Sequence, residues 1–282
     1  MSPPRGLRVL ALCASQEMVL AVRSRWTQTF AAAFCALSLG VAASGYILSG
    51  GSGVQDFART AASLVQLVLL LVPLTALLLG ALTLASERGN AELLFSQPVS
   101  RGIILFGRVL GLFQALVAAQ ALGFGAAGLL IYSRAGAEGL GGFLIVIGAS
   151  AVLTGICLGL AALIAAGSVG RGRTRALALA LVTWLVLVVL FDLAALGVAS
   201  LLGSGNASRL LISAAVLNPV DAIRTAALLG VEGKAAVGAA SLALLRFAGG
   251  AGRAGLLLAA SLVLWLTVPL ALAARRLSRA DI

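Results

Sequence analysis

The chain has no histidine, two methionines and three cysteines in 282 residues. Without histidine, His-based acid and base chemistry and His ligation of metals are excluded. Cys13, Cys35 and Cys157 lie far apart, so the sequence has neither a CxxC pair nor a Met-rich ladder for a soft metal. The GxxxxGK[ST] motif is also missing, so a P-loop ATPase is excluded and no catalytic, cofactor or metal site is expected in this chain.

Charge is scarce as well. Only 10% of the residues are charged, 61% are hydrophobic, and the mean hydropathy is +1.11. Soluble domains are roughly half apolar. These values exclude a soluble globular enzyme and predict one membrane domain over residues 1–282.

The apolar residues are grouped into runs long enough to cross a hydrocarbon core of ~30 Å. Five runs carry no charge, and a sixth, residues 176–208, is interrupted only by Asp192. Either half of the sixth run alone would be too short to span, so we expect one helix that carries an acid. The sequence therefore predicts an all-α integral membrane protein with six transmembrane helices, at about residues 27–49, 61–85, 109–131, 143–167, 177–201 and 254–274.

The formal charge of +11 reflects the arginines, which gather just outside the apolar runs. No basic face with interleaved aromatics appears, so a nucleic-acid partner is not expected and membrane lipid is. If the N-terminus is cytoplasmic, the short outer loops receive only Arg59 and Arg134. The cytoplasmic side then receives Arg5, Arg8, Arg23, Arg25, Arg88, Arg101, Arg108, Arg171, Arg173, Arg175, Arg275, Arg276 and Arg279. By the positive-inside rule, both termini are predicted to be cytoplasmic.

Residues 7–25 precede the first span and form a moderately amphipathic helical pattern, which favours an interfacial helix on the cytoplasmic leaflet over a frayed basic leader. Two small-residue spacings, Gly107 with Gly111 and Gly155 with Gly159, permit close helix contacts. Among 34 glycines such spacings also arise by chance.

The loop after the second span, residues 86–108, is predicted to be a cytoplasmic coupling loop. It has an acidic and basic start (Glu87, Arg88), a short apolar helix and a turn at Pro98, before Arg101 leads into the third span. A short helix parallel to the membrane would expose apolar side chains to something other than lipid tails. We therefore expect a cytoplasmic partner to bind there.

This loop resembles the corresponding loop of the permease subunits of ABC-2 type ATP-binding-cassette transporters. The residues that carry the resemblance are Glu87-Arg88-Gly89, Glu92-Leu93-Leu94, Pro98-Val99-Ser100-Arg101 and Gly107-Arg108. Asn90-Ala91 replaces the usual Gly-Thr, and Arg108 replaces a lysine. The resemblance implies an ABC-2 (type V exporter-like) permease in which an ATPase contacts Glu87, Arg88, Glu92, Leu93, Leu94, Phe95, Pro98, Arg101, Arg171, Arg173 and Arg175.

Two further stretches resemble the membrane subunits of Nos-type transporters, which serve maturation of the copper centres of nitrous-oxide reductase. They are Phe191-Asp192-Leu193 and Leu217-Asn218-Pro219-Val220-Asp221 with Arg224. The resemblance implies a multi-pass protein of the bacterial inner membrane, a second copy of the chain, two cytoplasmic ATPase subunits and a periplasmic accessory protein.

Asp192 is the only ionisable residue within a span core, where an ionised carboxylate costs ~3 kcal/mol or more without a partner or water. It is expected to lie in a conduit or dimer seam, or to make a helix–helix hydrogen bond, and no partner can be named for it. Residues 203–253 are predicted to be extracytoplasmic, either re-entrant, a surface helix or a solvated linker. Asn218, Pro219, Asp221 and Arg224 are candidates for contact with an outer partner.

The function predicted from these patterns is a transport permease powered by a separate ATPase. A chain without histidine and with two methionines is a poor conduit for a bare copper ion, so a sulfur-containing species, or mechanical work on a periplasmic partner, is favoured. The alternatives are an ABC-2 exporter of a lipid, antibiotic or peptide, and a proton-coupled carrier that uses Asp192.

Overall fold

The computed structural model describes residues 5–47, 54–85, 100–135, 140–168, 172–232 and 239–279. All regular structure within these ranges is helical, as the sequence predicts. The helices are α1 (Arg5–Arg23), α2 (Arg25–Ile47), α3 (Val54–Leu84), α5 (Arg101–Ala135), α6 (Leu140–Gly167), α7 (Arg173–Leu185), the π-helix η2 (Val186–Leu190), α8 (Phe191–Leu201), α9 (Ser204–Leu217), α10 (Pro219–Glu232), α11 (Ala239–Ala248) and α12 (Ala251–Arg279).

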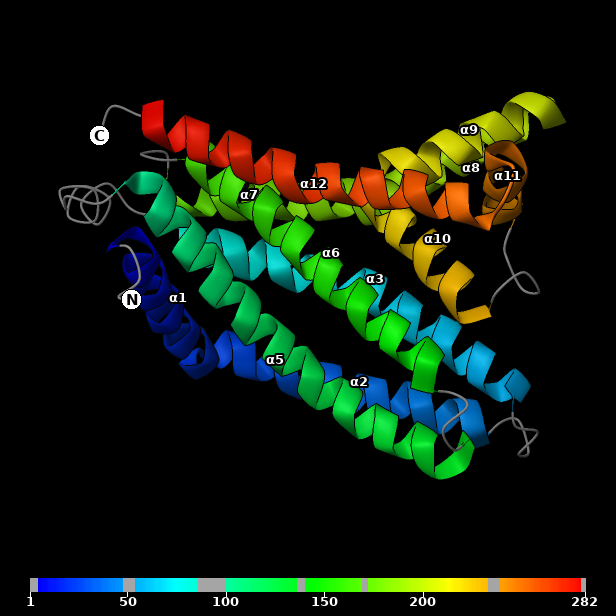
Figure 1. Ribbon diagram of the computed structural model, residues 1–282, viewed down its shortest axis with the longest axis horizontal. Helices are drawn as coiled ribbons and strands as arrows, with labels where there is room; N and C mark the ends of the chain where they lie inside the picture. The colour runs from blue at the N-terminus through cyan, green and yellow to red at the C-terminus, as the bar shows by residue number, and fades with distance from the viewer. Residues whose placement is uncertain are drawn as a thin grey trace.

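Six helical segments are long and apolar enough to cross a membrane, and they follow the six predicted spans in order. They are Arg25–Gly45, Thr60–Leu84, Arg101–Ser133, Gly141–Gly167, Arg173–Leu201 and Ala251–Arg279. The long helices run side by side, and α1 lies at the same end of the molecule as the start of α5 and the end of α12 (Figure 1). The chain thus forms an elongated bundle with the composition of a multi-pass membrane protein.

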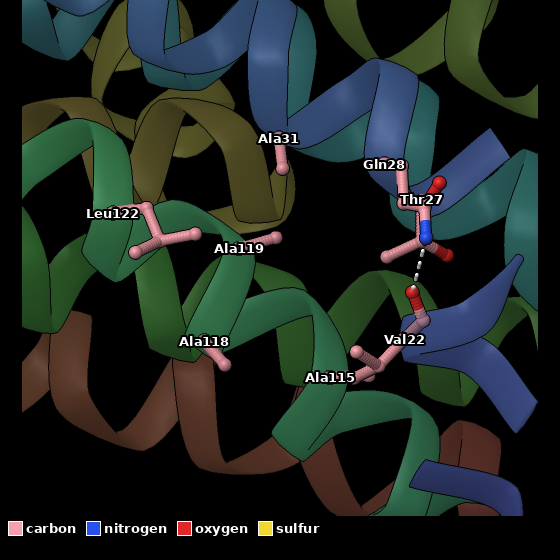
Figure 2. A pocket seen from close by; sticks show the side chains of 8 residues that line it. All are labelled: Val22, Thr27, Gln28, Ala31, Ala115, Ala118, Ala119 and Leu122. Atoms are coloured by element: carbon pink, nitrogen blue, oxygen red, sulfur yellow. Dashed lines mark hydrogen bonds between the residues drawn. The ribbon is translucent and has the colours of Figure 1, made fainter. Parts of the chain in front are cut away.

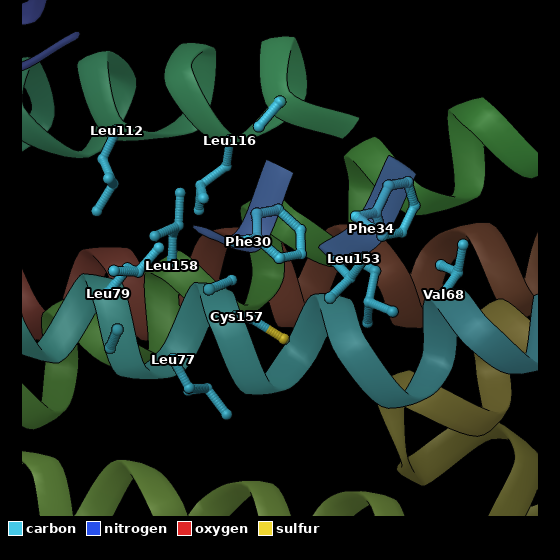
Figure 3. Packing of buried hydrophobic residues seen from close by; sticks show 14 of the residues in the cluster. Phe30, Phe34, Val68, Leu77, Leu79, Leu112, Leu116, Leu153, Cys157 and Leu158 are labelled. Atoms are coloured by element: carbon cyan, nitrogen blue, oxygen red, sulfur yellow. The ribbon is translucent and has the colours of Figure 1, made fainter. Parts of the chain in front are cut away.

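The bundle centre is formed by α3, α5 and α6, with α2 against α5 and α12 against α6. Apolar side chains from these helices share one core, seen in Figure 3, in which Phe34 meets Phe124 edge-on with ring centroids 5.1 Å apart. Cys157 is buried in this core and Cys35 is half-buried, and free cysteines in such places pack as small apolar side chains. Within the described residues, all three cysteines are free.

The glycine spacings mark real close approaches between helices. A Cβ added at Gly107 would lie 2.7 Å from Cys13 Cβ, and one added at Gly111 would collide with the Ala14 carbonyl oxygen, so α1 packs directly against the backbone of α5. A Cβ added at Gly155 would lie 3.0 Å from Cδ1 of Leu266 in α12, so the Leu266 side chain fills the space that this glycine leaves.

The third span begins at Arg101, eight residues before the predicted start at 109, so the end of the predicted coupling loop is helical. The physical reason is that Arg108 is neutralised within the bundle. Its Nε donates to Glu17 Oε2 of α1 at 3.0 Å, and its Nη2 donates to the Thr83 carbonyl of α3. An arginine that is paired inside the bundle does not need to end a span.

A buried polar contact that the sequence analysis missed joins α5 to α6. Gln120, which is 3% exposed, donates to Thr154 Oγ1 at 2.9 Å and accepts from Ser150 Oγ at 2.7 Å. Side-chain hydrogen bonds between helices of this kind hold membrane bundles in register.

The helix α1 covers residues 7–23 of the predicted interfacial segment 7–25, and its position at the membrane surface stays a prediction. Most of the predicted coupling loop lies outside the described residues. This applies to Glu87, Arg88, Glu92, Leu93, Leu94, Phe95 and Pro98, and also to Arg171.

Candidate functional site at the bend between α9 and α10

The segment after the fifth span folds into two helices, α9 and α10, which meet at Asn218 with a bend of 99°. The sequence Asn218-Pro219-Val220-Asp221 explains why a new helix starts there. Asn218 Oδ1 accepts the Val220 amide at 3.1 Å as an N-cap, and Pro219 occupies the first helical position, where its missing N–H costs nothing. Asp221 supplies a negative charge to the first turn, next to the positive end of the helix dipole.

The backbone groups that the bend frees are paired by neighbouring spans. Trp265 Nε1 of α12 donates to the Leu217 carbonyl at 3.1 Å, and Ser261 of the same helix donates to the Val216 carbonyl. Within a bilayer, non-helical backbone is tolerated only where protein or water satisfies it. Because α10 also packs against α3, α6 and α12, the bent pair α9 and α10, called the hairpin below, is part of the bundle, as in a broken span or a re-entrant loop, and not a solvated linker.

The fifth span is irregular where it faces this bend. The π-helix η2 separates α7 from α8 and ends one residue before Phe191-Asp192. Asn218 Nδ2 donates to the Leu187 carbonyl within η2 at 2.8 Å. Single π-turns inside α-helices occur frequently at functional sites, and this one joins the fifth span to the apex of the hairpin.

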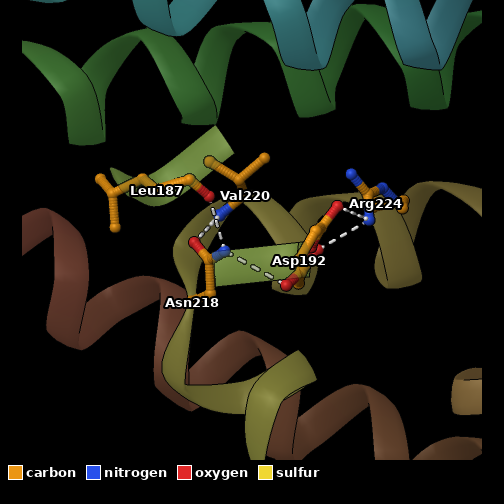
Figure 4. A network of polar contacts seen from close by, with 6 residues as sticks. Leu187, Asp192, Asn218, Val220 and Arg224 are labelled. Carbon is orange, nitrogen blue, oxygen red and sulfur yellow. Dashed lines mark hydrogen bonds and ion pairs between the residues drawn. The ribbon is translucent and has the colours of Figure 1, made fainter. Parts of the chain in front are cut away.

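A cluster of three charged side chains occupies the junction, and we call Asp192, Asp221 and Arg224 the apex cluster (Figure 4). Arg224 Nη1 lies 2.8 Å from Asp192 Oδ2 and 2.8 Å from Asp221 Oδ1. Asn218 Nδ2 reaches Asp221 Oδ2 at 3.1 Å, so the cap residue is part of the same network. The Asp192 and Arg224 side chains are each 28% exposed, and that of Asp221 is 11% exposed.

The structure therefore supplies the partner of Asp192 that could not be named from the sequence. Arg224 was assigned to the outer segment, and no base within a span core was available. The bend between α9 and α10 brings it to the fifth span. Asn218, Pro219 and Asp221, also predicted for an outer partner, are buried within this chain, and Asn218 is 1% exposed. Their contact with another protein stays a prediction.

The position of the apex cluster along the fifth span follows from helix geometry. Asp192 comes 19 residues after Arg173, the first residue of α7. At ~1.5 Å per residue this is roughly 28 Å, close to the full hydrocarbon thickness. The apex cluster thus lies far from the basic end of the span.

At that basic end, three residues predicted to contact an ATPase are within the described ranges. Arg101 Nη1 donates to the Leu277 carbonyl in the last turns of α12, at 3.1 Å. Arg173 and Arg175 are exposed in the first turn of α7. Arg101 thereby ties the end of the predicted coupling loop to the C-terminal helix.

Metal binding finds no support in the part of the chain that the structure describes, where no group of three or more Cys, Asp or Glu side chains is placed to hold an ion. The two carboxylates of the apex cluster share one guanidinium and so form a charge network rather than a ligand set. Chemically, these charges can hold α8 of the fifth span against α10, and a change in the charge of any one of them would alter that contact.

Comparison with known proteins agrees with this architecture. Residues 12–282 match the family described as ABC-2 family transporter protein. The chain is 36% identical over 236 residues to the probable ABC transporter permease protein NosY of Pseudomonas aeruginosa. This alignment covers 82% of this chain and 85% of the Pseudomonas protein. The chain is 34% identical over 235 residues to the protein of the same name from Stutzerimonas stutzeri, covering 81% and 85%.

Proposed function

The chain belongs to the ABC-2 family of transporter permeases of the bacterial inner membrane, and from that premise we propose that it serves copper-site maturation of nitrous-oxide reductase. In this proposal two copies of the chain form the membrane part of the transporter. Two cytoplasmic ATPase subunits supply the energy, and a periplasmic accessory protein receives the cargo or the mechanical work. The observation that carries the proposal is the 36% identity to a NosY permease over 82% of the chain.

The geometry offers a route by which ATP hydrolysis at one end reaches the other. The ATPase binds the coupling loop 86–108 together with Arg171, Arg173 and Arg175. A displacement of that end moves α7, and the fifth span carries the movement to the apex cluster. There the ion pair between Asp192 Oδ2 and Arg224 Nη1, which are 2.8 Å apart, passes the movement to α9 and α10.

The cargo favoured by the composition is a sulfur-containing species rather than a bare copper ion, because the sequence has no histidine and only two methionines. The alternative of a proton-coupled carrier centred on Asp192 loses support, since a permanently charged guanidinium already compensates that carboxylate. The alternative of an ABC-2 exporter of another cargo shares the fold and differs only in the outcome of the following experiment.

The proposal is tested by deleting the gene in its own host and measuring copper bound per nitrous-oxide reductase. We expect reductase that is secreted and folded but lacks its copper centres, with the wild-type gene on a plasmid restoring them. Fully copper-loaded reductase in the deletion strain would assign the chain to another ABC-2 cargo.

A further inference from the structure

A cavity of about 310 Å³ lies beside the elbow between α1 and α2. Its origin is geometric. The chain crosses α5 at two places where glycines permit backbone contact, with α1 on Gly107 and Gly111 and α2 on Gly123, which faces Phe34 and Cys35. Between these crossings the elbow stands away from α5. The volume is at the small end of the 300–1,000 Å³ typical of ligand sites.

The walls of the cavity change in character along its length (Figure 2). The α5 wall is a smooth apolar surface of Ala115, Ala118, Ala119 and Leu122, opposite Ala31 of α2. The elbow end is polar, with Thr27 and Gln28. Along α2 the distance from Arg25 to Ala31 is about 9 Å. The polar and apolar parts of the cavity therefore follow each other over a distance that a single lipid molecule can span.

Thr27 carries the strongest sign of a missing ligand. Its side chain lines the cavity although the residue is only 4% exposed, and its hydroxyl makes no hydrogen bond to any described residue. The neighbouring Gln28 is different, because its Nε2 donates to the Val22 carbonyl at 3.3 Å and so satisfies the end of α1. The Thr27 hydroxyl is open to the cavity, where it can donate a hydrogen bond to an acceptor of a bound molecule.

Positive charge lies next in sequence to the residues that line the elbow end of the cavity. Arg23 and Arg25 flank the elbow, both are exposed, and neither forms an ion pair with a described residue. Trp26 between them is 68% exposed, which is typical of an aromatic residue at a membrane interface. Together the elbow presents arginine charge, then a free hydroxyl, then methyl groups.

We propose that this cavity binds one anionic phospholipid, with its phosphate at Arg23 and Arg25, an ester carbonyl accepting from Thr27 and an acyl chain along Ala115, Ala118 and Ala119. A phospholipid has this same order of charge, ester and hydrocarbon. A bound lipid fills the gap between α1, α2 and α5, and so supports the contact of α1 with α5.

Native mass spectrometry of the purified full chain tests this proposal, using added phosphatidylglycerol or phosphatidylcholine as the probe. We expect one retained phosphatidylglycerol per chain. Ala118 is exposed and lines the cavity, so Ala118→Phe should fill the cavity and abolish lipid retention. Ala121 is also exposed on α5 but does not line the cavity, so the control variant Ala121→Phe should still retain the lipid. Arg23→Gln with Arg25→Gln should weaken phosphatidylglycerol binding ~30-fold. Arg209→Gln with Arg253→Gln matches that charge change elsewhere and should leave binding unaltered.

Thr27→Val keeps the shape of the side chain and should weaken the binding of both lipids about 5-fold. This variant provides a second readout if Ala118→Phe fails to fold. Equal retention by Ala118→Phe and Ala121→Phe would overturn the proposal, as would equal affinity of the wild type for the two lipids. Loss of the dimer in Ala118→Phe with lipid still bound would assign the cavity to a second copy of the chain and would also overturn it.

Discussion

Replacing Arg224 with glutamine should destabilise the protein far more than replacing Asp192 with asparagine. With all groups ionised, the apex cluster holds two carboxylates and one guanidinium, a net charge of −1. Asp192→Asn brings the net charge of the apex cluster to zero and keeps the ion pair between Arg224 and Asp221. Arg224→Gln leaves two carboxylates facing each other without a guanidinium, so that they repel each other unless one of them takes up a proton.

The magnitudes follow from burial. Breaking a fully buried ion pair costs about 3–5 kcal/mol, and an exposed pair contributes about 0–1 kcal/mol. Because Arg224 and Asp192 are each 28% exposed, we expect an intermediate cost of ~2–3 kcal/mol for Arg224→Gln. Asp192→Asn should cost ~1 kcal/mol or less, since its amide oxygen still accepts a hydrogen bond.

The assay is thermal unfolding of the purified full chain in detergent or nanodiscs, with Arg209→Gln as a control that removes an exposed arginine of α9. At about 2–4 °C per kcal/mol, Arg224→Gln should lower the apparent Tm by roughly 4–12 °C and Asp192→Asn by about 4 °C or less. The double variant should be less destabilised than the sum of the two, because removing both partners leaves one carboxylate instead of two. Equal losses for the two single variants would refute the charge argument.

Three further predictions follow from the described contacts. Gly111→Leu should detach α1 from α5, because its Cβ meets the Ala14 carbonyl, and limited proteolysis should then release the N-terminal segment; an uncleaved variant contradicts this packing. Gln120→Leu should cost ~1–2 kcal/mol by leaving the buried Ser150 hydroxyl without its acceptor, while Thr154 keeps its bond to the Ser150 carbonyl; apparent Tm measures the loss, and an unchanged Tm would mean that the network is not stabilising. In a cysteine-free background, Gly205→Cys should react with an impermeant maleimide in intact cells and Arg173→Cys only after permeabilisation; the reverse pattern would invert the topology.

The sequence was sufficient for the number and order of the six helices that can span a membrane, because membrane thickness sets a length that apolar runs must reach. It was also sufficient to mark Asp192 as exceptional. These features depend on residue type and local spacing alone.

What the sequence did not supply were contacts between segments far apart in the chain. Arg224 follows Asp192 by 32 residues and becomes its partner only because the hairpin folds back against the fifth span. Glu17 and Arg108 are 91 residues apart and meet because two glycines admit α1 to α5. An unpaired acid in an apolar span does signal that a base must come from another part of the chain.

The central claim is that this chain is the membrane half of an ATP-driven machine, and the most direct measurement is the ATPase that accompanies it. The full chain, purified from its own membranes with a terminal tag, should carry an ABC ATPase in equal amount and hydrolyse ATP. Leu94→Asp with Phe95→Asp should remove that ATPase without stopping membrane insertion, because charges placed in an apolar contact stay unpaired. A wild-type chain that purifies without any ATPase, or a double variant that keeps it in full amount, would contradict the account.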